Sequence, residues 1–333
     1  MKRLLSVLAG TACLVVSSSG AIAAGSARVS LLTAPFGTSS YVLGAALQDI
    51  SNKTKAPVRI DSSESPGYVF NIKKLASDAD ARKSTMVGSG KGLLSLAAEG
   101  GKPFDKKYKP LKLIGNYNLV SVWLATLNPK IKTIQDLAGK HIGLGRATQI
   151  NWTIQPQKII QAGYGMGSDK IHISYLGTKE SVSALLDGHV DAAVVGGYMN
   201  PFTHKFVLSP QTTQFMASGR KVYFIPWDKD AVEKTVKKTG VAMIPLTLPA
   251  NTIDGQSEAL PVFADTNGWF VSEDFPKKEA YEITKMIIQN VGKFASYHAL
   301  GKLMSKKALV VGFSEQQISP GALKAYREAG ILK

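Results

Sequence analysis

The chain has 333 residues, of which 44% are hydrophobic, and a mean hydropathy of +0.01, as in an ordinary globular protein. Its formal net charge is +16, but the basic residues are dispersed and are not interleaved with stacking aromatic residues, which argues against a nucleic-acid partner. A single cysteine, Cys13, excludes a disulfide scaffold.

The N-terminus has the pattern of a secretory signal peptide. Lys2 and Arg3 are followed by an apolar run over residues 4–16, and Ala21-Ile22-Ala23 supplies small residues for cleavage. The run is shorter than the about 20 apolar residues that span a bilayer. We therefore expect residues 1–23 to be removed near Ala23 and the mature chain to be a soluble, monomeric, periplasmic protein.

Two alternatives to a cleaved leader are a retained N-terminal anchor and a lipoprotein modified at Cys13. The lipoprotein signal needs a branched aliphatic residue three positions before the cysteine, where this chain has Gly10. With the leader removed, the mature chain carries a net charge of +14 and has no thiol for catalysis or metal binding.

Strands and helices are expected to alternate along the first hundred residues. The strands are predicted over residues 28–32, 57–60 and 84–87. Each is followed by a loop of small, hydroxyl-bearing residues that opens a helix, and the third of these loops is Gly88-Ser89-Gly90-Lys91-Gly92. Alternation of this kind is typical of a parallel α/β sheet.

A long extended stretch over residues 111–127 precedes a second series of strands and helices. Further strands are predicted over residues 140–144, 170–175 and 190–195, and a strand followed by a helix over 221–244. A second extended stretch covers residues 260–271, and three helical stretches close the chain.

This order predicts a two-lobed α/β clamshell with two extended hinge crossings. We expect one lobe to comprise residues 27–120 and 262–333, and the other to comprise residues 121–261. Open α/β sheets bind ligands beyond the carboxyl ends of their strands, so the ligand cleft is expected between the lobes.

No catalytic or metal-binding motif is present. The segment 88–92 lacks the first glycine and the final Ser or Thr of a phosphate-binding loop. The five histidines show no H-x-x-x-H spacing. No enzymatic activity, no cofactor and no metal are therefore expected.

Four loops instead have the composition of anion-binding helix starts. Backbone N–H groups at a helix N-terminus, with hydroxyl groups beside them, favour a negative charge, although each loop can also be an ordinary capped helix start. The loops are Thr38-Ser39-Ser40-Tyr41, Gly88-Ser89, Thr148 to Trp152, and Gly196-Gly197-Tyr198.

Arg146 is the strongest single candidate for ligand binding, because it follows a predicted strand and its guanidinium can pair with a carboxylate through two hydrogen bonds. The aromatic residues of these loops are predicted either to wall the pocket or to pack in the core. The candidate ligand-binding residues are Thr38, Ser39, Ser40, Tyr41, Gly88, Ser89, Arg146, Thr148, Asn151, Trp152, Gly197 and Tyr198. The expected ligand is a small organic anion.

Four segments resemble the TAXI family, the extracytoplasmic solute receptors of TRAP transporters. They are residues 37–44 (GTSSYVLG), 134–145 (IQDLAGKHIGLG), 185–192 (LLDGHVDA) and 319–330 (SPGALKAYREAG). The resemblance implies a type II periplasmic-binding fold without a cofactor. It also implies delivery of the solute to a membrane permease driven by an ion gradient.

The chain departs from the family pattern at two places near the expected cleft. Arg146-Ala147-Thr148 stands where the family has Ser, Gly and Thr, and residues 86–91 lack the usual Gln-x-Asp. The family's typical ligands, glutamate and related 2-oxo acids, therefore do not carry over directly. The alternatives are a receptor for an ABC or tricarboxylate importer and a periplasmic enzyme on the same fold.

Overall fold

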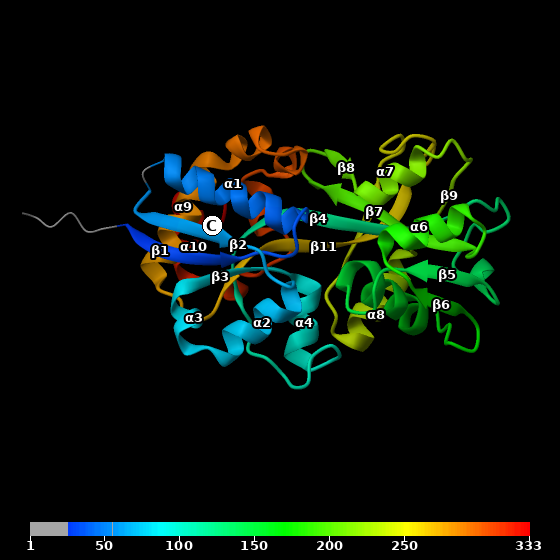
Figure 1. Ribbon diagram of the computed structural model, residues 1–333, viewed down its shortest axis with the longest axis horizontal. Helices are drawn as coiled ribbons and strands as arrows, with labels where there is room; N and C mark the ends of the chain where they lie inside the picture. The colour runs from blue at the N-terminus through cyan, green and yellow to red at the C-terminus, as the bar shows by residue number, and fades with distance from the viewer. Residues whose placement is uncertain (1–25, 55) are drawn as a thin grey trace, which may run out of the picture.

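Two long strands, β4 (Lys112–Thr126) and β11 (Leu260–Val271), run between the two halves of the molecule and connect them (Figure 1). The computed structural model describes residues 26–54 and 56–333. In Figure 1 the first and last parts of the chain form the left half, and the middle of the chain forms the right half. We call these halves lobe I and lobe II.

Lobe I is built on three parallel strands, β1 (Ala27–Leu32), β2 (Val58–Ser63) and β3 (Thr85–Gly90), with β1 between the other two. Its helices are α1 (Ser39–Lys53), α2 (Tyr68–Ser77), α3 (Ala79–Ser84), α4 (Lys91–Glu99), α9 (Lys277–Asn290) and α10 (Pro320–Glu328). Short 3-10 turns connect α9 to α10 between Val291 and Gln317.

Lobe II has a second parallel group, in which β5 (His141–Leu144) lies between β6 (His172–Tyr175) and β7 (Ala192–Met199). Short strands lie beside it and beside the crossings: β8 (Phe206–Leu208), β9 (Tyr223–Ile225) and β10 (Ile244–Leu248). A 3-10 turn (Gln135–Leu137) precedes β5. The helices are α6 (Thr178–Leu186), α7 (Pro210–Met216), α8 (Lys229–Thr239), and a helix over Ile150–Gly163 in which π-helical turns flank α5 (Gln155–Lys158).

The strands join in one mixed sheet with the order β2-β1-β3-β11-β4-β7-β5-β6. The predicted parallel pairing is right within each lobe, but β11 runs antiparallel to β3 and β4, and β4 runs antiparallel to β7. The reason is topological: β4 carries the chain out of lobe I and β11 brings it back, so the two strands must point in opposite directions.

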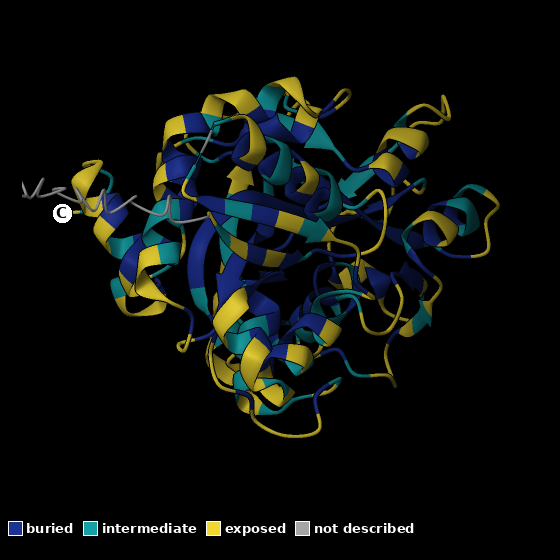
Figure 2. Ribbon diagram, turned by 60° about the vertical axis from the view of Figure 1, so that its left-hand side comes forward, coloured by how far each residue is buried: buried dark blue, intermediate teal, exposed yellow. Residues whose placement is uncertain are grey.

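Each lobe has its own hydrophobic core, and the crossing strands pass from one core into the other. On β4 the change falls between Tyr117 and Leu119, and on β11 it falls between Ala264 and Trp269. Figure 2 shows the buried strands enclosed by helices whose outer faces are exposed. The buried residues at the change of core are polar: Asn118 on β4, and Asp265, Thr266 and Asn267 on β11.

Two predicted loops are wrong, because they belong to strands. Gly88 and Ser89 lie within β3, where β11 pairs with them, and Gly197 and Tyr198 lie within β7, where β4 and β8 pair with them. Hydrogen bonding to a strand distant in the sequence extends both strands past their apolar residues. The chain then continues from β7 into β8, and no helix starts at Gly196.

The predicted signal peptide, residues 1–23, lies outside the described residues. Among the residues that are described, no helix is both long and apolar enough to cross a membrane.

Candidate functional site: a cleft between the lobes

A cavity of about 630 Å³ lies between the lobes. Lobe I contributes Ala34, Pro35, Thr38, Ser39, residues 66–70 and Leu93; lobe II contributes Arg146, residues 148–152 and Tyr198; the crossing strands contribute Val120 and Asn267. These segments follow strands β1, β2 and β5, as expected for a ligand site of an α/β sheet.

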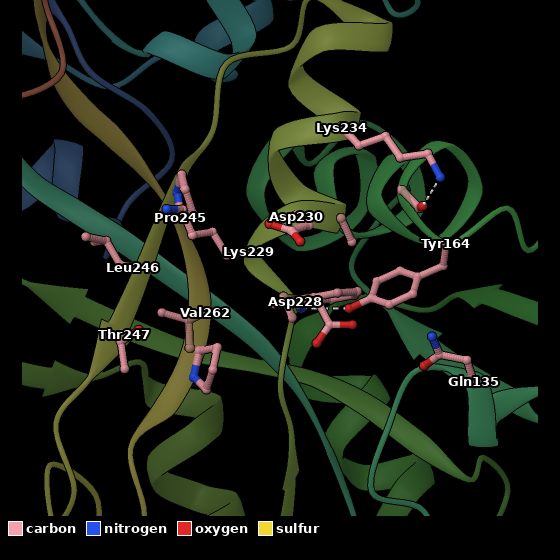
Figure 3. A pocket seen from close by; sticks show the side chains of 14 residues that line it. Gln135, Tyr164, Asp228, Lys229, Asp230, Lys234, Pro245, Leu246, Thr247 and Val262 are labelled. Carbon is pink, nitrogen blue, oxygen red and sulfur yellow. Dashed lines mark hydrogen bonds between the residues drawn. The ribbon is translucent and has the colours of Figure 1, made fainter.

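A larger groove of about 870 Å³ lies on lobe II between α8 and strands β10 and β11 (Figure 3). Two of its polar groups are paired: the backbone N–H of Asp228 donates to Tyr164 Oη at 2.7 Å, and Lys234 Nζ donates to the Gly163 carbonyl at 2.9 Å. Because the groove involves one lobe, whereas both lobes line the interlobe cleft, we take the cleft as the candidate site.

A tight turn after β5 places Arg146 on the cavity side of lobe II. The Gly145 N–H donates to the Trp152 carbonyl (3.0 Å), and the side-chain oxygen of Gln149 accepts from the Arg146 N–H (2.7 Å). A Cβ at Gly145 would lie 2.8 Å from the Cβ of Trp152, so the close packing of this turn favours glycine. The turn fixes the backbone of Arg146 at the edge of the cavity.

The positive charge of Arg146 is not neutralised within the described residues. Their arginine salt bridges involve Arg28, Arg82 and Arg327, and the exposed Arg146 lines the cavity without an acidic partner. Its guanidinium is therefore available for a ligand.

The N-terminus of helix α1 lies across the cavity from the loop that carries Arg146. Thr38 caps the helix by accepting the Tyr41 N–H at 3.3 Å, and Ser39 follows on the cavity wall. Ser40 is buried behind them, and a Cβ at Gly88 would lie 2.3 Å from its hydroxyl oxygen. Gly88 therefore makes room for Ser40 and does not itself line the cavity.

Seven of the twelve predicted site residues line the cavity: Thr38, Ser39, Arg146, Thr148, Asn151, Trp152 and Tyr198. Ser40, Tyr41, Gly88, Ser89 and Gly197 do not. The Tyr41 ring packs instead against Phe36, with ring centroids 5.0 Å apart. Gly197 packs against β8, whereas a Cβ at its neighbour Gly196 would lie 3.1 Å from the Trp152 ring.

The aromatic residues that line the cavity are Tyr68, Phe70, Trp152 and Tyr198. Burial raises the pKa of Tyr68, whose hydroxyl lies 2.6 Å from that of Tyr117, and burial raises the pKa of Tyr198 to about 12. Both phenols are therefore neutral near pH 7, and they add hydrogen-bonding groups without adding negative charge.

The sequence analysis missed Asp265, a buried acid on β11 that bonds to both lobes. Its carboxylate accepts from four donors: the Gly92 N–H (3.0 Å), the Thr266 N–H (2.8 Å), Asn151 Nδ2 (3.0 Å) and Gln155 Nε2 (3.1 Å). Gly92 belongs to α4 of lobe I, and Asn151 and Gln155 belong to the helix of lobe II. Burial raises the pKa of Asp265 to about 6, although these hydrogen bonds oppose the shift.

Asn118 and Asn267 form a second polar pair that was missed. Asn267 Nδ2 donates to Asn118 Oδ1 at 3.2 Å, and the other two amide atoms, Asn267 Oδ1 and Asn118 Nδ2, have no partner among the described residues. The available signal was the alternation of polar residues, with Asn116 and Asn118 on β4 and Asp265 and Asn267 on β11, inside otherwise apolar strands. Alternate residues of a strand face the same side, and buried polar groups need partners.

Within the part of the chain that is described, no three His, Cys, Asp or Glu side chains are grouped to hold a metal ion. The rings of His141 and His172 pack edge to face with centroids 5.0 Å apart on adjacent strands. This pair is a contact between strands β5 and β6.

Residues 31–330 match the family model described as the NMT1-like family. The chain belongs to this family. No curated protein matches the sequence.

Several solved structures share the fold at low sequence identity. A TctC solute-binding protein from Polaromonas has a TM-score of 0.51 at 16% identity, covering 92% of this chain and 96% of that one. R. palustris Rpa4515 with adipate has a TM-score of 0.50 at 13% identity, covering 91% and 94%. The putative sulfonate-binding protein SsuA from Methylobacillus flagellatus has a TM-score of 0.50 at 14% identity, covering 90% and 76%. The predicted two-lobed periplasmic-binding-protein fold is thereby confirmed.

Asp265 predicts a specific pH dependence of stability. Folding raises the pKa of the Asp265 carboxyl from 3.8 to about 6, so the folded protein binds the carboxyl proton more tightly than the unfolded chain does. This tighter binding stabilises the folded state at low pH, and the stabilisation is lost as the pH rises from about 4 to about 6. Asp265→Asn stays neutral throughout. Its free energy of unfolding relative to the wild type should therefore increase by about 2 kcal/mol from pH 4 to pH 7.

Urea denaturation at several pH values measures this difference. Asp274→Asn, which changes an exposed aspartate just beyond β11, is the matched control and should differ from the wild type by less than about 0.5 kcal/mol throughout. A difference between Asp265→Asn and the wild type that does not change with pH would show that the Asp265 carboxyl is not desolvated.

Proposed function

We propose that this protein is a periplasmic receptor that binds a small organic anion between its two lobes. The observation that carries the proposal is the unpaired guanidinium of Arg146 in a cavity that both lobes line. Pockets for small molecules typically measure about 300–1,000 Å³, and the volume of this cavity falls in that range.

The charge balance of the cavity wall favours an anion over a cation. Arg146 is the charged residue among the described lining residues, and neither Asp nor Glu is among them. Opposite it, the N-terminus of α1 presents backbone N–H groups with the hydroxyl of Ser39 beside them. A helix N-terminus carries partial positive charge and stabilises bound anions.

The proteins with similar folds support this class of ligand. Rpa4515 was solved with adipate, an organic dianion, and SsuA is described as a sulfonate-binding protein. We propose an anion as the shared class of ligand and not adipate or a sulfonate itself, because at identities of 13% and 14% only the fold carries over.

We further propose that the receptor delivers its solute to a TRAP-type permease, on the strength of the resemblance to the TAXI family. The second candidate is an importer of the ABC or tricarboxylate type, which is favoured by the sulfonate-binding and TctC neighbours. Deleting the TRAP-type permease genes, and separately those of the ABC or tricarboxylate type, and measuring uptake of the bound solute decides between the two. A periplasmic enzyme would instead convert the solute, which mass spectrometry of the incubated ligand would detect.

The proposed lobes are residues 27–120 with 262–333, and residues 121–261. The change of core at positions 117–119 and 264–269 supports boundaries close to these. The hinge is then formed by β4 and β11, the two segments that pass between the lobes.

Ligand binding should close the lobes about this hinge, because the ligand gains hydrogen bonds from both sides only when they approach. Small-angle X-ray scattering, with and without a ligand identified by thermal shift, should show a smaller radius of gyration for the complex. An unchanged radius at saturating ligand would refute the hinge.

Arg146→Ala should weaken binding of that ligand by about 2–5 kcal/mol, because it removes the cationic partner of an ion pair that closure of the lobes buries. The variant should fold normally, since the side chain is exposed and contributes little to either core. Calorimetry measures the affinity, and Arg220→Ala, which changes an exposed arginine of lobe II outside the cleft, is the control. Equal affinity for wild type and Arg146→Ala, or a best ligand without negative charge, would contradict the anion proposal.

A further inference from the structure

We propose that Asp265 and Gln155, which lie behind the cleft wall, hold the amide of Asn151 so that its oxygen faces the ligand. The bound anion therefore carries an N–H or O–H donor that meets this oxygen. The inference rests on the proposed function and adds a requirement to it: a negative charge alone does not make a good ligand.

Both hydrogens of the Asn151 amide nitrogen are already used in hydrogen bonds to other side chains. Nδ2 donates to Gln155 Oε1 at 3.0 Å and to Asp265 Oδ2 at 3.0 Å. Its oxygen, Oδ1, accepts from none of the described residues and remains accessible, and Asn151 lines the cavity. An amide nitrogen has two hydrogens, so Asn151 can offer the ligand only an acceptor.

The amide of Asn151 cannot turn over without losing these bonds. In the reversed orientation Oδ1 would face the Asp265 carboxylate and the oxygen of Gln155, and all three groups are acceptors. Gln155 is itself fixed, because its Nε2 donates to the Ala242 carbonyl at 2.9 Å and to Asp265 Oδ2 at 3.1 Å. The carboxylate thus sets the orientation of both amides.

Asp265 is in turn held by backbone groups. It accepts the N–H of Gly92 at 3.0 Å in the first turn of α4 and the N–H of Thr266 at 2.8 Å. A Cβ at Gly92 would lie 2.3 Å from Gln155 Nε2 and 2.5 Å from Asp265 Oδ2, so glycine allows this close approach. Asp265 and Gln155 do not line the cavity, which makes them positioning residues for Asn151.

Asn267 also lines the cavity, but its amide oxygen is not a second acceptor for the ligand. Its Nδ2 donates to Asn118, and its Oδ1 is buried beneath the cavity surface without a partner among the described residues. The cavity therefore combines a cation, Arg146, with one accessible amide oxygen, that of Asn151, which fits an acid that also bears an amino or hydroxyl group.

Matched sets of acids test this requirement by calorimetry at pH 7.5. Each set contains a plain acid and its hydroxy and amino derivatives: succinate, malate and aspartate; glutarate, 2-hydroxyglutarate and glutamate; phenylacetate, mandelate and phenylglycine. In the set that binds, the best donor-bearing member should bind at least about tenfold more tightly than the plain acid, because the plain acid leaves the oxygen of Asn151 without a donor in the closed cleft. The hydroxy and amino members distinguish the two kinds of donor.

Variants separate positioning from a general effect on the fold. Asp265→Asn should reduce the preference for the donor-bearing acid to less than about threefold, while the plain acid binds as before. Asn151→Leu, which removes the oxygen directly, should do the same and serves if Asp265→Asn does not fold. Asp274→Asn should keep the full preference. A variant that merely loosens the fold weakens all members of a set alike and leaves the ratio of their affinities unchanged.

The outcomes distinguish the two claims. Plain acids that bind wild type as tightly as their derivatives, or an unchanged preference in Asp265→Asn and Asn151→Leu, would overturn the inference and leave the anion receptor intact. Binding by none of the nine acids, or binding that is insensitive to Arg146→Ala, would overturn the proposed function and the inference with it.

Discussion

The hydrogen bonds of the Asp265 carboxylate are the interaction on which the region between the lobes depends. The chain crosses between the lobes on two strands, and each strand must leave one hydrophobic core before entering the next. At that point β11 carries a buried acid, and a buried charge is tolerated only when donors surround it. The donors come from the first turn of α4 in lobe I and from Asn151 and Gln155 in lobe II. One carboxylate thereby ties both lobes to the crossing strand and also orients part of the cleft wall.

The polar residues around the cleft have two different roles: one contacts the ligand, and the others orient the group that contacts it. Arg146 lies on an exposed turn, where its charge is free to meet a ligand. The residues that orient the amide of Asn151, Asp265 and Gln155, are buried, and their geometry is fixed by packing and by hydrogen bonds. Fixed polar groups cost little reorganisation when a ligand arrives, so a rigid wall favours specificity.

The alternation of strands and helices was predictable because it depends on local periodicity. The loop after β1 and the turn around Arg146 were found for the same reason, since small and hydroxyl-bearing residues mark helix starts locally. Ser89 and Gly197 were misassigned because their conformation depends on pairing with β11 and β8, which no local pattern records. Asp265 was missed because its role is defined by partners 110 to 173 residues away in the chain.

The central claim is that the solute lies between the lobes and contacts both Arg146 and the amide of Asn151. A crystal structure of the protein with its tightest-binding acid tests it most directly. We expect density for the acid in the interlobe cleft, with its carboxylate on the Arg146 guanidinium and a donor on Asn151 Oδ1. Density for the acid in the outer groove of lobe II beside Tyr164 and Lys234 (Figure 3), with the cleft free of it, would contradict the account.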